Sequence, residues 1–264
     1  RNSWKRSADR SGTSLGLKLE SIMSLFRCSI FLLAALNCPR AIAEPKPGEF
    51  AAGSIDVGGA TREYRLVVPK AVDPTKSAPL VIAFHGMLID SKDVMHVYTK
   101  LNETAEKHKF LIAYPHAVDK ISGLTPEKIK NDLEMFDALL AKVSADYKID
   151  ADRIYVLGMS NWGYFAHLVG KERSKPVAAV ASHSGPLGLQ TLFGVKADRK
   201  FPVLIIHGDK DPLLSVIFAR ENSDKYKKEG HEVKYVELKG EGHSWGIKAE
   251  VDETIWEFFA EHKR

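Results

Sequence analysis

Two serines lie between glycines, and each could be a nucleophile. Residues 242–246 ("GHSWG") match G-x-S-x-G, in which a serine sits on a sharp strand-to-helix turn. Residues 158–163 ("GMSNWG") depart from this pattern, because Trp162 stands where the second glycine belongs. A serine hydroxyl is a weak nucleophile and needs a base, usually a histidine oriented by a carboxylate. The neighbouring elements therefore decide between Ser160 and Ser244.

Apolar runs alternate with helical periodicity over most of the chain. Strands are expected at residues 62–68, 79–84, 110–114, 153–157, 177–181, 203–206 and 233–238, and helices at 93–109, 126–147, 214–228 and 248–261. Continuous apolar runs are typical of strands buried on both faces. The order predicts an α/β fold: an open, mostly parallel sheet with helices on both faces and a minimal lid.

Candidate catalytic groups follow the predicted strands in the order serine, aspartate, histidine. Ser160 comes just after the strand at 153–157, Asp209 and Asp211 follow the next-to-last strand, and His243 follows the last one. Because ligands bind at the carboxyl ends of strands in such sheets, these groups are expected to meet. The residue types and their order predict nucleophilic catalysis by a serine.

Ser160 is the better candidate nucleophile of the two serines. It directly follows an apolar strand and precedes a helical stretch at 161–169, which is the context that the sharp turn requires. Two glycines separate Ser244 from its strand, and the acids and histidine that follow Ser244 lie on one predicted helix. The literal match at 242–246 is interpreted as part of the loop that presents His243.

Three motifs together resemble a known family. "GMSN" around Ser160, "HGDKDP" at 207–212 and "GEGHSW" at 240–245 are similar to the exported polyhydroxybutyrate depolymerase, feruloyl esterase and acetylxylan esterase family of α/β-hydrolases. The likeness covers most of residues 62–262, and the third motif is the most specific. It implies hydrolysis of carboxylic esters through an acyl-enzyme, with Ser160 as nucleophile, Asp211 as triad acid and His243 as base. It favours Asp211 over Asp209, which stands two residues earlier.

Further residues are assigned to the same site. The oxyanion hole is expected to use the backbone N–H groups of Asn161 and Met87. Trp162, Trp245 and His183 are candidate substrate contacts. Trp162 leaves three alternatives: a shifted helix with Gly163 making the close approach, a narrowed acyl pocket, or a distorted site that only binds.

The first 43 residues read as a leader. From Met23 the sequence has Arg27, an apolar run at 28–36 and Ala41-Ile42-Ala43, which predicts a signal peptide at 23–43 cleaved after Ala43. Residues 1–22 are then an extension before the true start, and 44–264 a single α/β-hydrolase domain. The protein is expected to be exported, to the periplasm or the medium. The apolar run is too short for a stable membrane anchor.

Composition excludes several other classes. Residues 1–43 carry 7 of the 38 basic and 2 of the 34 acidic residues, which leaves 31 basic and 32 acidic residues and argues against a nucleic-acid partner. Both cysteines, Cys28 and Cys38, lie in the leader, which excludes thiolate catalysis and cysteine metal sites in residues 44–264. No cofactor or metal is expected, and the partner is a small-molecule or oligomeric ester. The oligomeric state is not indicated. The alternatives are an impaired hydrolase that binds esters or glycans, a serine peptidase, or a thioesterase.

Overall fold

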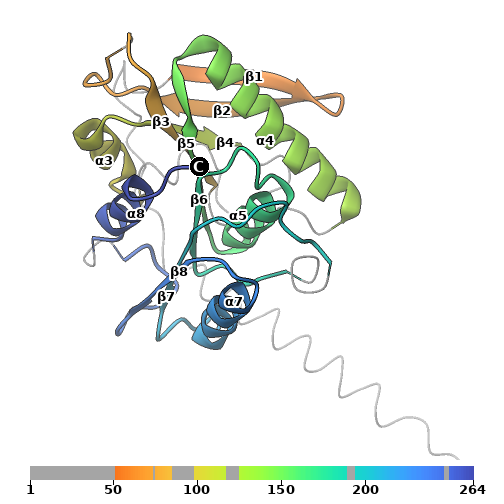
Figure 1. Cartoon of the computed structure of the whole chain (residues 1–264), viewed down its shortest axis with the longest axis vertical. Helices are drawn as coiled ribbons and strands as arrows, with labels where there is room; N and C mark the ends of the chain where they lie inside the picture. Colours follow the sequence, from red (N-terminus) through yellow and green to blue (C-terminus); the bar gives the residue numbers. More distant parts are fainter. Residues whose placement is uncertain (1–50, 74, 85–97, 117–124, 189–193, 247–249) are drawn as a thin grey trace, which may run out of the picture. The chain divides into compact units, whose positions relative to one another are not determined.

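The computed structural model describes residues 51–73, 75–84, 98–116, 125–188, 194–246 and 250–264, all within the unit Pro45–Arg264. Strands and helices alternate along this unit (Figure 1). The strands are β1 (Ala51–Val57), β2 (Ala60–Val67), β3 (Ala78–Phe84), β4 (Leu111–Pro115), β5 (Ile149–Met159), β6 (Ala179–His183), β7 (Val203–Gly208) and β8 (Val233–Leu238). The helices are α3 (Leu101–His108), α4 (Pro126–Asp146), α5 (Asn161–Glu172), α7 (Val216–Lys228) and α8 (Val251–Ala260).

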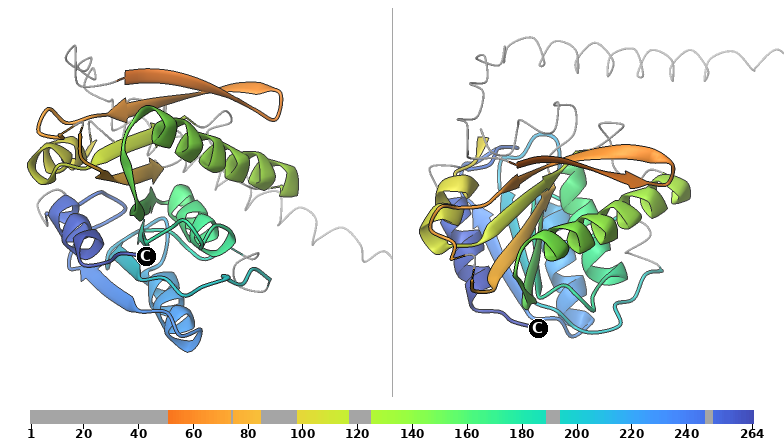
Figure 2. Two further views of the ribbon diagram at one scale, coloured as in Figure 1. Left: turned by 45° about the horizontal axis from the view of Figure 1, so that its top comes forward. Right: turned by 90° about the horizontal axis from the view of Figure 1, so that it is seen from above.

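These strands form one eight-stranded, mostly parallel sheet. Its order is β1-β2-β4-β3-β5-β6-β7-β8, and only the β1–β2 and β2–β4 pairs are antiparallel. Helices α3 and α8 cover one face, while α4, α5 and α7 cover the other (Figure 2). The predicted α/β-hydrolase class of fold is therefore confirmed. The arrangement brings the carboxyl ends of β5, β6, β7 and β8 to one edge of the sheet.

The β1–β2 hairpin adds a strand that the sequence did not predict. Gly58 and Gly59 form its two-residue turn with φ of +59° and +79°, and Val57 pairs with Ala60 across it. Two successive positive φ angles are what a tight hairpin turn with the native strand twist requires, and glycine adopts them without steric cost.

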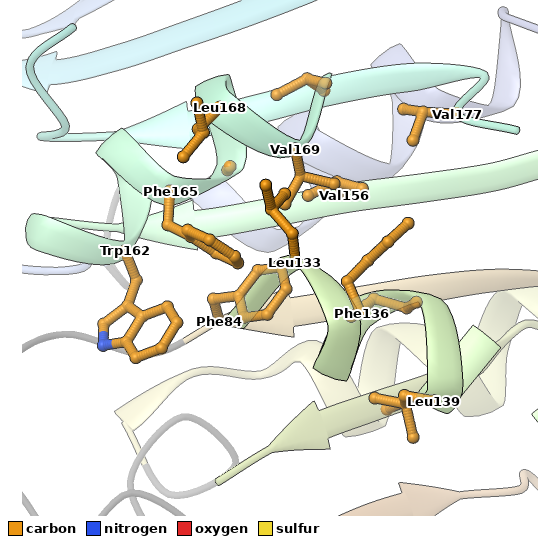
Figure 3. Close-up of a cluster of buried hydrophobic side chains, with 14 of the residues drawn as sticks. Phe84, Leu133, Phe136, Leu139, Val156, Trp162, Phe165, Leu168, Val169 and Val177 are labelled. Carbon is orange, nitrogen blue, oxygen red and sulfur yellow. The ribbon is translucent and has the colours of Figure 1, made fainter. Parts of the chain in front are cut away.

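The sheet separates two hydrophobic cores, and β3 shows why. Leu80, Ile82 and Phe84 point to the core beneath α4 and α5, whereas Val81 and Ala83 point to the core beneath α3 and α8. Successive side chains of a strand face opposite sides, so a strand between two helical layers must be apolar throughout. Figure 3 shows the first core, where side chains of α4 and α5 meet Phe84.

Within the described part of the chain, no helix has both the length and the apolar character needed to cross a membrane.

Candidate active site

Ser160 forms the sharp turn between β5 and α5. Its backbone has φ 58° and ψ −128°, a conformation that costs a non-glycine residue about 1–3 kcal/mol. The Ser160 N–H donates to the carbonyl of His183 at 2.8 Å, and the Ser160 carbonyl accepts the N–H of Gly163 at 2.9 Å. These bonds hold the strained turn and leave the side chain partly exposed at the sheet edge. A serine on a strained strand–turn–helix is the geometry of a nucleophile elbow.

Two glycines let α5 start close to the sheet. A Cβ on Gly158 would lie 2.1 Å from the carbonyl oxygen of Trp162, and a Cβ on Gly163 would lie 2.8 Å from the Cα of Gly185. Backbone atoms cannot move aside cheaply, so neither position has room for a side chain. Gly163 therefore lies where α5 approaches the end of β6 closely.

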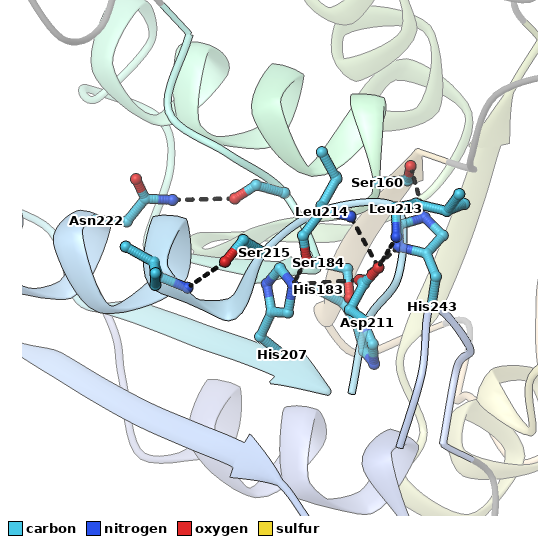
Figure 4. A network of polar contacts seen from close by, with 12 residues as sticks. Ser160, His183, Ser184, His207, Asp211, Leu213, Leu214, Ser215, Asn222 and His243 are labelled. Carbon is cyan, nitrogen blue, oxygen red and sulfur yellow. Dashed lines mark hydrogen bonds and ion pairs between the residues drawn. The ribbon is translucent and has the colours of Figure 1, made fainter. Parts of the chain in front are cut away.

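His243 bridges Ser160 and Asp211 (Figure 4). Its Nε2 lies 2.9 Å from Ser160 Oγ, and its Nδ1 lies 2.6 Å from Asp211 Oδ2. The Nδ1–H donates to the carboxylate, so Nε2 is the basic nitrogen that accepts from the serine hydroxyl. The loop of His243 packs tightly on the end of β7, since a Cβ on Gly208 would lie 2.4 Å from the carbonyl of Glu241.

The Asp211 carboxylate is buried and well supplied with donors. Its side chain is 0% exposed, and Oδ1 accepts the backbone N–H groups of Leu213 and Leu214, each at 2.9 Å. Burial by itself raises the pKa of Asp211, but the hydrogen bonds from Leu214, His243 and Leu213 outweigh it and leave the pKa below its ordinary value. The carboxylate is therefore ionised at neutral pH and fixes the orientation of His243.

Asp209 and Ser244 have other partners. Asp209 Oδ1 accepts the N–H of Gly240 at 2.6 Å and so ties the end of β7 to the loop after β8. Ser244 is exposed, and its hydroxyl donates to Glu241 at 3.1 Å. The structure thus brings together Ser160, Asp211 and His243, while Asp209 and Ser244 form hydrogen bonds with other partners.

Trp162 packs in the core beneath α4 and α5. Its indole is 3% exposed, stacks on Phe84 with centroids 5.5 Å apart, and meets Phe165 edge to face at 5.3 Å (Figure 3). Its large apolar side chain therefore contributes to the stability of the fold.

Trp245 and His183 are buried and pack against each other. Their rings stack with centroids 5.2 Å apart, and the Trp245 indole N–H donates to the buried Asp252 carboxylate at 3.0 Å. Burial, together with the nearby His207 and His243, lowers the pKa of His183 to about 3, so its ring is neutral. His183 contacts the site through its backbone carbonyl, which holds Ser160.

Of the two expected oxyanion donors, the structure describes one. Asn161 is the first residue of α5, directly after Ser160, where helix N–H groups and the helix dipole favour negative charge. Met87 lies outside the described residues.

His207 is a contact of Asp211 that the sequence analysis did not assign. Its Nε2 lies 3.2 Å from Asp211 Oδ2 and 2.8 Å from the carbonyl oxygen of Leu214. The sequence signal was the spacing of four between His207 and Asp211 in "HGDKD", which a turn at a strand end can close. In the described ranges, no three His, Cys, Asp or Glu residues are grouped so as to hold a metal ion.

The fold and the strained serine turn define the class of protein, an α/β-hydrolase. Residues 114–258 match the phospholipase/carboxylesterase family, and the chain belongs to that family.

Individual relatives agree with this assignment. The chain is 28% identical over 158 residues to a bifunctional acetylxylan esterase/xylanase of Neocallimastix patriciarum, covering 60% of this chain and 22% of that protein. A solved thermostable esterase superimposes with a TM-score of 0.68 at 23% identity, covering 82% of this chain and 63% of the other. A CE1 ferulic acid esterase of Anaeromyces mucronatus gives 0.63 at 19% identity, with coverages of 85% and 96%. At these identities the likeness to the solved structures shows the fold alone. The chain spans less than half the length of the curated relatives it matches.

Proposed function

We propose that the protein is a serine hydrolase of carboxylic esters with Ser160, His243 and Asp211 as its triad. The observation that carries this proposal is the continuous path of hydrogen-bond contacts from Ser160 Oγ to His243 Nε2 and from His243 Nδ1 to Asp211 Oδ2, at 2.9 and 2.6 Å. Nucleophile, base and orienting acid then stand in the order that general-base catalysis requires. Membership of the phospholipase/carboxylesterase family supports the same chemistry.

The reaction has two halves. The Ser160 oxygen attacks the ester carbonyl while its proton passes to His243 Nε2, and the tetrahedral intermediate expels the alcohol, which takes that proton. Water then attacks the acyl-enzyme, gives its proton to His243, and the acid leaves as the proton returns to Ser160. Asp211 keeps His243 in the tautomer with hydrogen on Nδ1 and stabilises the imidazolium.

We propose the backbone N–H of Asn161 as one donor of the oxyanion hole. It follows the nucleophile at the start of α5, where the donor belongs in this fold. The loss of one oxyanion donor typically costs about 2.7–4 kcal/mol of transition-state stabilisation. The second donor, Met87, remains a prediction from the sequence.

For the substrate we propose esters with an apolar acyl or alcohol group. Leu213, Ile217 and Phe218 are 69%, 54% and 44% exposed, and Leu213 donates its N–H to Asp211 next to the triad. Exposed apolar side chains on the segment that carries Leu213 and on the start of α7 favour an apolar ligand surface. The relatives named acetylxylan esterase and ferulic acid esterase support acyl esters of polysaccharides, with hydroxyalkanoate oligomers as the other candidate. We also propose that the protein is exported after cleavage following Ala43.

A panel of model esters tests the function. The purified protein should hydrolyse acetyl, butyryl and feruloyl esters, and Ser160→Ala should remove the activity by several orders of magnitude, because losses of about a million-fold follow removal of a triad serine in another fold. Ser244→Ala is the matched control, since its exposed hydroxyl contacts only Glu241 among the described residues. A folded Ser160→Ala variant with wild-type rates would overturn the proposal. Binding of esters without turnover would favour the impaired hydrolase, and preference for thioester or peptide substrates would favour the other two alternatives.

A further inference from the structure

The Asp211 carboxylate has a close polar neighbour beyond His243. His207 is buried near the end of β7, and its Nε2 faces two acceptors, the Leu214 carbonyl at 2.8 Å and Asp211 Oδ2 at 3.2 Å. Two acceptors at one nitrogen require that nitrogen to carry the hydrogen. The Nδ1 atom of His207 has no hydrogen-bond partner among the described residues. A hydrogen on Nε2 accounts for the bond to Leu214.

We infer that His207 is a positioning residue for the triad acid. Its Nε2–H donates to the Leu214 carbonyl and lies 3.2 Å from Asp211 Oδ2, so one side chain joins the carboxylate to the backbone of the segment that leads into α7. Asp211 accepts two backbone N–H groups on Oδ1 and the His243 imidazole on Oδ2, and the His207 imidazole lies against Oδ2 at ion-pair distance. A carboxylate held on both oxygens cannot rotate away from His243.

The position of His207 beside Oδ2 also affects how strongly Asp211 attracts the proton of His243. The nearby His207 N–H places a partial positive charge beside the carboxylate and so weakens its stabilisation of the His243 imidazolium. Removal of that donor makes the carboxylate a stronger partner for the imidazolium. In a plot of hydrolysis rate against pH, the fall of the rate on the acid side (the acid limb) should then occur at higher pH. Among the described residues, the titratable groups that interact with His207 are Asp211, His183 from β6 and Glu237 from β8.

A matched pair of variants isolates the donor. His207→Phe keeps a ring of similar volume without an N–H, whereas His207→Gln places an amide N–H at a similar distance from the backbone. His207→Phe should lower kcat about ten-fold, because the carboxylate is held less firmly. KM should stay within roughly two-fold, as expected for a group that does not touch substrate. The acid limb of the pH–rate profile should shift upward by about half a pH unit. His207→Gln should restore most of kcat and the wild-type limb. An effect on folding alone would lower the midpoint of thermal unfolding without moving the limb.

This inference rests on the proposed function, but one readout needs no activity. Nuclear magnetic resonance of the ring nitrogens in the wild-type protein should show His207 with its hydrogen on Nε2, and the His243 titration midpoint should move upward in His207→Phe. An inactive wild type with these signals would overturn the proposed function and leave the inference standing. Hydrogen on Nδ1 of His207, or a folded His207→Phe with unchanged kcat, limb and midpoint, would overturn the inference.

Discussion

Replacement of Trp162 by alanine should cost much stability, because its indole fills the core beneath α4 and α5. A tryptophan buries about 150–250 Å², and at about 25 cal/mol per Å² the 3% exposure of Trp162 implies about 4–6 kcal/mol of hydrophobic stabilisation. Alanine retains part of this area, and the stacking on Phe84 and the edge contact with Phe165 are lost. The expected loss is about 3–5 kcal/mol in the free energy of unfolding.

Urea unfolding followed by far-ultraviolet circular dichroism measures this loss without depending on tryptophan fluorescence. Leu213→Ala is the matched control, because a side chain that is 69% exposed should change the free energy of unfolding by less than about 0.5 kcal/mol. A loss below about 1 kcal/mol for Trp162→Ala, equal to that of the control, would refute the packing argument. It would return Trp162 to the list of candidate pocket residues.

Three further predictions follow from the buried groups and from the close contacts of the site. Burial lowers the pKa of both His167 and His183 to about 3; unfolded histidine binds protons near about 6.5, so stability present above that pH is lost as the pH falls toward 3. Urea unfolding at pH 8 and pH 5 should differ by about 4 kcal/mol, and equal stability at the two values would contradict the burial argument. Gly163→Ala should cost about 1–3 kcal/mol and reduce kcat, since its Cβ would press on the backbone of a neighbouring loop; an active variant of wild-type stability would show that α5 can move aside. Asp211→Asn should lower kcat about 10⁴-fold and Asp209→Asn should change it little, and steady-state kinetics giving the reverse order would reassign the triad acid.

Most of the fold could be predicted from local patterns. The apolar run at 203–206 marks β7, and the alternating run at 233–238 coincides with β8. Helix α7 begins at 216 rather than 214, because the Ser215 hydroxyl accepts the Ile217 N–H and caps it. Strand β1 was missed, since its sequence lacks a clear apolar alternation and is held by pairing with β2.

Less of the candidate site than of the fold could be predicted from the sequence. Strand order was enough to place Ser160, Asp211 and His243 at one sheet edge, where the structure brings them into contact, while their catalytic roles remain predictions. Local sequence could not separate Asp209 from Asp211, since the choice depends on how the loop after β8 packs against β7. The contact of His207 with Asp211 was not predicted either, because the spacing of four in "HGDKD" shows that a turn could bring the two residues together but not that their side chains meet.

Covalent labelling tests the central claim most directly. A fluorophosphonate reacts with a serine only where a working base activates it, and peptide mass spectrometry locates the adduct. The protein should carry one adduct on Ser160, and His243→Ala should suppress labelling while the protein stays folded. An adduct on Ser244, or a folded wild-type protein that does not react at all, would contradict the assignment of Ser160 as the nucleophile.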